Sequence, residues 1–259
     1  KNLKFSATAL DIQTLNDEAL KGTYEATAIS FALYPLICEE YALLRTAVSF
    51  GEGYGPKLVK KKGAVLKRNF KVALSGKHTT NALLFRMAYP QARVIYKNFL
   101  DIESAVLSGE VDAGVLIHES ILDFSDELCV EREIWDIWSE LAGENLPLPL
   151  GGMAVRRSLP ITDATECERV LTEGVRIATA HKPFLSHMLM ERNLIRVDKE
   201  KLKTYLNLYA NDSSVSMNET QLKAVNKLFA LGYERGFYPL PIKAENYLVP
   251  TEYNDIRFS

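Results

Sequence analysis

Hydrophobic and polar residues alternate with two different periods along the first 130 residues, and the changes of period predict strands and helices in turn. Leu3, Phe5 and Ala7 alternate with polar neighbours, as in a strand. Asp11 can cap a helix over residues 12–21, which Gly22 ends. Further strands are predicted over residues 24–30, 71–74, 92–96 and 112–118, and further helices over residues 31–39, 79–88 and 101–107.

Repeated strand–helix–strand units predict a parallel sheet with helices on both faces. After one more strand over residues 153–157, helices are predicted over residues 166–180, 183–192, 201–209 and 219–233. Such a helical tail suits a two-lobed α/β protein whose chain crosses to a second lobe and returns. We place the crossings near residues 68–72 and 148–152, so that residues 1–70 and 151–259 form the first lobe and residues 71–150 the second.

Polar residues stand at the ends of three predicted strands. Ser30, the pair Thr79 and Thr80, and His118 all occupy such positions. Ligands of parallel sheets bind at the carboxyl ends of the strands, so we expect these side chains to face a cleft. The hydroxyls can instead be plain helix N-caps, and that alternative stays open. A helix N-terminus also offers free N–H groups that can hold a carboxylate.

His118 follows an apolar run that is typical of a buried strand. A neutral imidazole can take up a proton near pH 7, which makes His118 a candidate base. A structural histidine is the equally weighted alternative. His78 lies beside the threonine pair and can line the same cleft, whereas His181 and His187 fall in the helical tail and are expected to be structural or exposed.

Charge and cysteine content limit the classes of partner. Lys plus Arg number 31 against 33 for Asp plus Glu, a balance that argues against nucleic-acid binding. No apolar stretch approaches the roughly 18 residues that a membrane helix needs. Cys38, Cys129 and Cys167 form no CxxC pair, which favours reduced thiols in a cytoplasmic protein. We therefore expect a small-molecule substrate as partner, with the number of subunits left open.

Motifs for metals and nucleotides fail at single positions. His118 and Glu119 begin like a zinc-protease helix, but Leu122 stands where the second histidine is needed. Gly76 and Lys77 suggest a phosphate loop, but Lys71 replaces its first glycine. The chain contains no GxSxG elbow of a serine hydrolase. We expect neither a cofactor nor a metal.

Several segments together resemble the 1,4-dihydroxy-6-naphthoate synthase family of the futalosine route to menaquinone. The most specific are GEVDAGVLIHE at residues 109–119 and LPLPLG at residues 146–151. The others, in family order around these two, are DIQTLN at 11–16, AISF at 28–31, GYGP at 53–56, GKHTT at 76–80 and YAN at 209–211. Family members begin further upstream, so we expect an N-terminal strand and a cleft-reaching loop to be missing from this chain.

The resemblance implies a type 2 periplasmic-binding-protein-like fold: two α/β lobes, with parallel or mixed sheets flanked by helices, around a ligand cleft. It implies a lyase that converts cyclic dehypoxanthine futalosine into 1,4-dihydroxy-6-naphthoate and dihydroxyacetone. His118 would be the proton acceptor, and the implied substrate contacts are Ile29, Ser30, Thr79, Thr80, Asn81 and Asn16.

Two other functions compete with this one. A solute-binding receptor shares the fold and also grips carboxylates, but it needs no base and requires an export signal. The related pathway dehydratase, which makes an enolpyruvyl benzoate, has a similar fold with different motifs. The segment at residues 109–119 favours the synthase.

Overall fold

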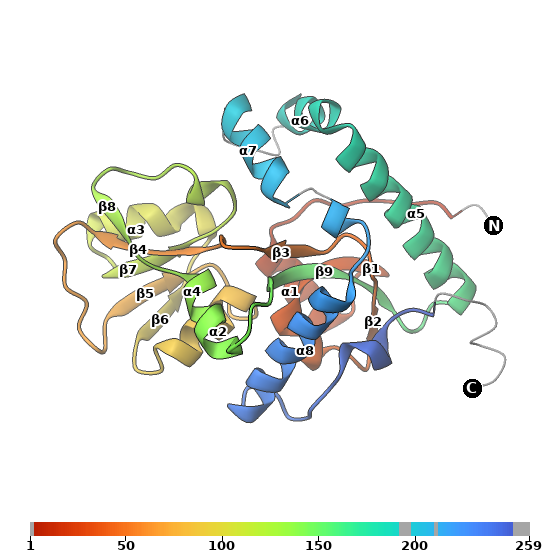
Figure 1. Ribbon diagram of the computed structural model, residues 1–259, viewed down its shortest axis with the longest axis horizontal. Coiled ribbons are helices and arrows are strands. Elements are labelled where there is room, and N and C mark those ends of the chain that lie inside the picture. Colours follow the sequence, from red (N-terminus) through yellow and green to blue (C-terminus); the bar gives the residue numbers. More distant parts are fainter. Residues whose placement is uncertain (1–2, 192–197, 210–211, 251–259) are drawn as a thin grey trace.

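Two lobes lie side by side in the computed structural model, which describes residues 3–191, 198–209 and 212–250 (Figure 1). Each lobe is built on one sheet, and helices flank both sheets. Within the described ranges, no helix combines the length and apolar character that a membrane crossing requires. The two-lobed α/β architecture expected from the sequence is therefore confirmed.

The first lobe contains a sheet in which β9 pairs antiparallel with each of the other strands. β9 (Leu148–Arg156) pairs with β1 (Ala26–Ser30), β2 (Tyr41–Leu43) and β3 (Ser49–Gly51). The prediction of a parallel sheet is wrong here. The local pattern of strand, helix and strand cannot reveal that a strand more than 100 residues later inserts between β1 and β2.

The second lobe contains the parallel strands that the sequence predicted. In the order β6-β5-β7-β4-β8, β5 (Lys71–Leu74) pairs parallel with β6 (Arg93–Tyr96) and β7 (Ala113–Leu116). β4 (Lys57–Lys61) pairs antiparallel with β7 on one side and with β8 (Leu128–Glu133) on the other, which completes the sheet. Since β4 belongs to this sheet, the chain crosses before residue 57, and the crossing expected near residues 68–72 is wrong.

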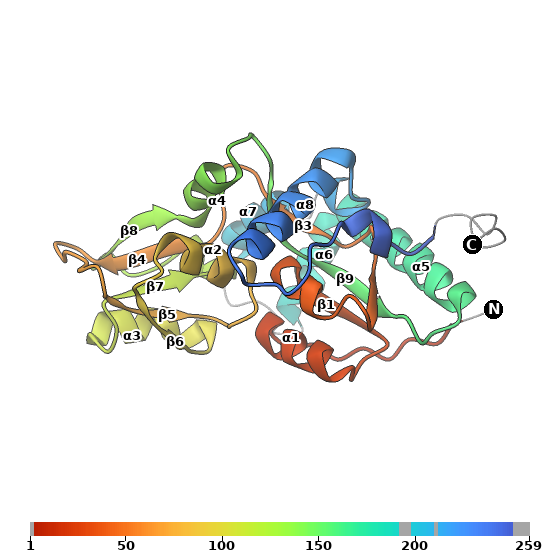
Figure 2. The same ribbon diagram turned by 90° about the horizontal axis from the view of Figure 1, so that it is seen from below.

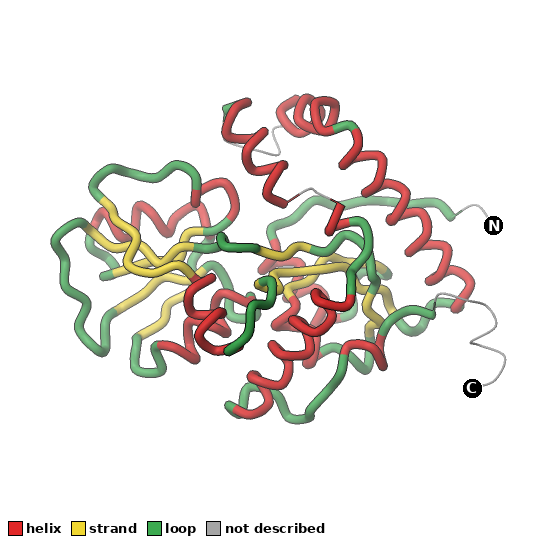
Figure 3. Tube along the Cα trace, viewed as in Figure 1, coloured by secondary structure: helices red, strands yellow, loops and turns green. Residues whose placement is uncertain are grey.

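The helices cover the faces of both sheets and follow the predicted pattern closely (Figure 3). Asp11 caps the first helix by accepting hydrogen bonds from two backbone N–H groups, and Gly22 ends it in a left-handed conformation. The expected strand over residues 3–7 is wrong, because this exposed segment has no strand to pair with. The helix expected over residues 31–39 is a short 3₁₀ helix (Phe31–Leu36). The first-lobe helices are α1 (Ile12–Lys21), α5 (Ile161–Ala180), α6 (Lys182–Glu191), α7 (Lys199–Tyr209) and α8 (Glu219–Glu234); the second-lobe helices are α2 (Thr80–Ala88), α3 (Ile102–Ser108) and α4 (Ile134–Ala142).

Two expected features extend past the described residues. The predicted end of the helix at Arg192, and Ala210 and Asn211 of the YAN segment, lie outside them.

One hydrophobic core runs through both lobes where α2, α4, α8 and β9 meet (Figure 2). Trp138 of α4 is fully buried there, and its indole N–H donates to the carbonyl of Leu146 over 2.8 Å. Phe85 of α2 and Leu148 of β9 belong to the same cluster. The lobes are thus joined by packed side chains as well as by the crossing chain. This packing fixes how the cleft residues of one lobe lie relative to those of the other.

A second core lies between α3 and the second sheet and depends on a glycine. A Cβ added to Gly114 of β7 would come within 2.4 Å of Ile102 and 3.0 Å of Val106. Gly114→Ala should therefore lower the free energy of unfolding by about 1–3 kcal/mol through overpacking. The matched control is Gly174→Ala in α5, where nothing lies within 4 Å of the added methyl group. Urea unfolding should show this control raising stability by roughly 0.5–1 kcal/mol; equal effects at both positions would contradict the packing described here.

Candidate functional site

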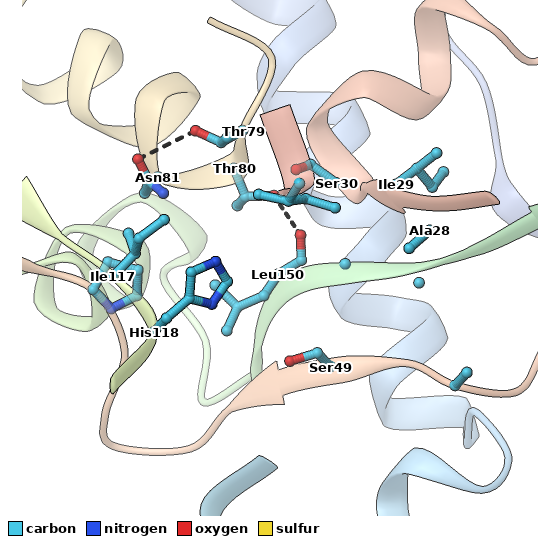
Figure 4. Close-up of a pocket in the computed structure, with 15 residues that line it drawn as sticks. Ala28, Ile29, Ser30, Ser49, Thr79, Thr80, Asn81, Ile117, His118 and Leu150 are labelled. Atoms are coloured by element: carbon cyan, nitrogen blue, oxygen red, sulfur yellow. Dashed lines mark hydrogen bonds between the residues drawn. The ribbon is translucent and has the colours of Figure 1, made fainter. Parts of the chain in front are cut away.

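A pocket of about 290 Å³ lies between the lobes, near the lower end of the roughly 300–1,000 Å³ range of small-molecule sites. Apolar side chains form most of its wall, and the described residues that line it include no Lys, Arg, Asp or Glu. Figure 4 shows hydroxyl and amide groups on one side and His118 facing them. The lining residues are Ile12, Ala28, Ile29, Ser30, Ala47, Ser49, Pro56, Thr79, Thr80, Asn81, Ile117, His118, Leu150, Gly151 and Gly152.

Ser30 ends β1 and is held by a residue beneath it. Asn16 in α1 is fully buried and donates from its amide to Ser30 Oγ over 3.0 Å. The Ser30 backbone N–H donates in return to Asn16 Oδ1 over 2.9 Å. Asn16 therefore supports Ser30 and does not itself line the pocket. Because Ser30 Oγ only accepts in this pair, its own proton is available to a ligand.

Thr79 and Thr80 begin α2, and both hydroxyls are engaged with the protein. Thr79 is the N-cap, since its Oγ1 accepts from Ala82 N over 3.3 Å. Thr80 Oγ1 donates to the carbonyl of Leu150 over 3.1 Å and so links α2 to β9. The capping role left open by the sequence is therefore confirmed for Thr79. The first-turn backbone N–H groups of Thr80 and Asn81 have no acceptor within the helix.

Asn81 is nearly buried in the first turn of α2, beside the cap. Its Oδ1 accepts from the Thr79 hydroxyl over 3.2 Å, so its amide nitrogen faces away from the cap (Figure 4). No described residue accepts from that nitrogen. With Ser30 and the end of α2, it brings neutral hydrogen-bond donors to one side of the pocket.

His118 lies just after β7, which ends two residues earlier than predicted. The backbone of His118 has φ +54°, a left-handed conformation, and begins a 3₁₀ turn (His118–Ile121). Its ring packs edge-on against Phe99, with 5.2 Å between the ring centres. Burial lowers the pKa of the His118 imidazole, and the Glu119 and Asp11 carboxylates oppose this shift. The ring forms no hydrogen bond to any described residue, so a neutral nitrogen is free to take up a proton.

Backbone strain is concentrated at this pocket. Among the described residues, only Ala47 and His118 combine a side chain with a positive φ, and both line the pocket. Each such residue costs of the order of 1–3 kcal/mol, and this kind of strain is typical of functional sites. The Ala47 N–H donates to the carbonyl of Ser214 over 2.9 Å, which helps hold the strained turn in place.

The structure gathers nearly all the site residues expected from the sequence. Ile29, Ser30, Thr79, Thr80, Asn81 and His118 line one pocket, and Asn16 lies behind Ser30. His78 does not line it; its backbone N–H approaches Gln13 Oε1 at 3.4 Å. His187 is exposed on α6, as expected.

Several pocket residues escaped sequence reasoning, notably Ala47, Ser49 and the pair Gly151 and Gly152. A Cβ on Gly151 would lie 2.7 Å from the carbonyl oxygen of Ile29, so only glycine fits against β1 there. The alternation of Val48, Ser49 and Phe50 is a strand signal that points Ser49 away from the core. Only the pairing with β9 shows that this direction is the pocket.

Comparisons with known proteins agree on a single family. Residues 1–234 match the family described as menaquinone biosynthesis. A curated Thermus thermophilus protein named 1,4-dihydroxy-6-naphtoate synthase is 30% identical over 230 residues, which cover 87% of this chain and 82% of its own length. A Streptomyces coelicolor protein of the same name is 26% identical over 243 residues, covering 90% and 84%.

Solved structures share the architecture. The crystal structure of protein AF1704 from Archaeoglobus fulgidus is similar with a TM-score of 0.81 at 35% identity, covering 88% of this chain and 85% of that one. The periplasmic aliphatic sulphonate binding protein SsuA from Escherichia coli gives a TM-score of 0.61 at 12% identity, covering 91% and 79%. This second likeness concerns the fold alone, and it confirms the expected periplasmic-binding-protein-like fold.

The lowered pKa of His118 is directly measurable. An NMR titration of the ring protons should place the midpoint of His118 below the usual value of about 6.5, with His118→Asn identifying the signal by its loss. The unfolded chain then binds the proton more readily than the folded protein, so stability should fall as the pH drops below about 6.5. A midpoint above that value would contradict the burial of the ring.

Proposed function

The chain belongs to the menaquinone-biosynthesis family, and on this premise we propose that it is the carbon–carbon lyase 1,4-dihydroxy-6-naphthoate synthase. Its substrate would be cyclic dehypoxanthine futalosine, and dihydroxyacetone would be the second product. The names of the two curated relatives support this assignment. The observation that carries it is a desolvated, unpaired imidazole facing hydrogen-bond donors across an uncharged, largely apolar pocket.

The pocket suits a flat, mostly apolar molecule that bears one carboxylate. Ile12, Ile29 and Ile117 supply apolar walls. The carboxylate would be held by the N–H groups that begin α2, together with the hydroxyl of Ser30 and the amide of Asn81. No Lys or Arg stands among the described residues that line the pocket, so in this proposal neutral donors and the positive end of the helix would hold the anion.

His118 would act as the base of the reaction. It would remove a proton from a carbon next to a carbonyl group, and the electron pair would pass to the carbonyl oxygen as an enolate. Collapse of the enolate would break the bond to the ribose-derived fragment, which would leave with the bonding electron pair and take up the proton that His118 had accepted. An aromatic diol would remain, and its aromaticity favours the products. Preorganised hydrogen-bond donors would lower the free-energy cost of the developing negative charge.

The fold likeness to SsuA supports one alternative, a receptor for a small carboxylate. A receptor needs no base, so the strained backbone and free ring of His118 would have no purpose in it. Both observations favour the lyase. A cytoplasmic location is part of the same proposal. The receptor alternative would instead place the protein outside the cytoplasm.

The direct test is incubation of the purified protein with cyclic dehypoxanthine futalosine. Chromatography should detect 1,4-dihydroxy-6-naphthoate, and exhaustive dialysis against EDTA should leave the rate unchanged. Among the described residues, no group of three or more His, Cys, Asp and Glu side chains could hold a metal ion. Ligand binding without turnover would instead support the receptor. Loss of turnover on dialysis, restored by a metal ion, would contradict the proposed chemistry.

His118→Asn tests the assignment of the base. Asparagine has a similar polarity and tolerates the left-handed backbone at this position, but it cannot accept a proton near neutral pH. We expect kcat to fall by at least about 10²-fold, in line with general-base catalysis, while product binding measured by calorimetry changes little.

The matched control is His78→Asn, the same substitution in the same lobe outside the pocket lining, which should keep kcat within a fewfold. The wild-type kcat should decrease toward acid pH as the imidazole becomes protonated, with a midpoint below about 6.5 if the lowered pKa persists in the complex. Near-normal turnover by His118→Asn would require another base.

A further inference from the structure

We propose that Ser49 is a further substrate-positioning residue, whose hydroxyl donates a hydrogen bond to the oxygen-rich, ribose-derived part of the substrate. The assignment rests on the proposed function, because a substrate with such a fragment gives this hydroxyl a partner. Neither the motifs nor the family resemblance pointed to Ser49.

The register of the first sheet places Ser49 opposite Ser30. Both serines pair with Gly151, Ser30 from β1 and Ser49 from β3, on the two sides of β9. Residues in register across an antiparallel sheet point to the same face, and both serines line the pocket. With neighbouring strands about 4.7–4.9 Å apart, the two serines stand roughly 9–10 Å from each other. Ser30, Gly151 and Ser49 thus form a row across the sheet, with one hydroxyl at each end and a glycine between them.

The backbone around Ser49 holds it in this direction. The next residue, Phe50, is nearly buried and packs against Phe31 with 5.5 Å between the ring centres. Side chains alternate along a strand, so anchoring Phe50 turns Ser49 toward the other face. Upstream, the strained Ala47 is tied to Ser214 by a backbone hydrogen bond of 2.9 Å. Ser49 therefore sits on a fixed segment, as a positioning residue requires.

The hydroxyl of Ser49 is half-buried and forms no hydrogen bond with any described residue. Figure 4 shows it across Leu150 from Ser30 and Thr80, pointing toward the second-lobe side where His118 lies. If the substrate carboxylate occupies the side of Ser30 and α2, the opposite end of the molecule reaches Ser49. That end carries the hydroxyl groups of the ribose-derived fragment, whose oxygens can accept a hydrogen bond from Ser49.

The test compares substrate and product. Ser49→Ala removes one neutral hydrogen bond, so kcat/KM should fall about three- to tenfold through a higher KM, with kcat within twofold. The Kd of 1,4-dihydroxy-6-naphthoate, measured by calorimetry, should stay within twofold because the product lacks the ribose-derived fragment. Ser49→Thr keeps the hydroxyl on a residue favourable in strands and should recover most of the lost kcat/KM.

Ser104→Ala is the matched control, since this exposed serine of α3 bonds only to the carbonyl of Asp101 and should change neither constant. An unchanged KM in Ser49→Ala, an equal defect in Ser49→Thr, or a parallel loss of product affinity would each overturn the assignment while leaving the proposed function intact. No naphthoate from the wild-type protein would overturn the proposed function and this inference together. Thermal unfolding of each variant separates a contact defect from a folding defect, and a KM defect that merely follows lost stability would also overturn the inference.

Discussion

Antiparallel pairing of β9 is the interaction on which the rest of the structure depends. This strand leaves the second lobe, enters the first sheet and pairs with β1, β2 and β3 along its length. Its first residues also contact the second lobe, because the carbonyl of Leu150 accepts a hydrogen bond from the hydroxyl of Thr80. The same few residues therefore complete one sheet, join the lobes and form the floor of the pocket.

Two glycines on β9 allow this strand to complete the sheet, join the lobes and form the floor of the pocket. A side chain on Gly151 would collide with the backbone of β1, and one on Gly152 would come within 3.0 Å of Phe31. Without side chains, β9 leaves an open floor between Ser30 and Ser49. The pairing of β3 with β9 shifts register between Ser49 and Phe50; Ser49 lines the pocket, whereas Phe50 packs into the core. Packing requirements and ligand space are met by the same residues.

The pocket is electrostatically quiet, and this suits the proposed chemistry. In the part of the chain that the structure describes, no Lys, Arg, Asp or Glu side chain lines it. Burial lowers the pKa of His118, which favours the neutral ring at neutral pH. A base of this kind is ready to accept a proton, whereas an ion pair would keep the imidazole protonated. The donors on the opposite side are neutral, and the end of α2 supplies only a partial positive charge. The strain at Ala47 and His118 is a cost that the surrounding packing sustains.

The sequence by itself determined the local features of this protein. Asp11 and Gly22 predicted both ends of α1, and the threonine pair indicated the start of α2, because such signals depend on residues a few positions apart. The parallel strands β5, β6 and β7 were equally readable, and so were the strand ends that carry Ser30, the threonine pair and His118. Those residues do line one pocket.

Only the tertiary structure decided what depends on distant pairing. It shows that β4 belongs to the second sheet and that the first sheet is antiparallel. It also shows that Asn16 supports Ser30 by a hydrogen bond. It also showed Ser49 facing the pocket. Hydrophobic periodicity reports which face of an element is buried, but it does not say which element, more than 100 residues away, buries that face.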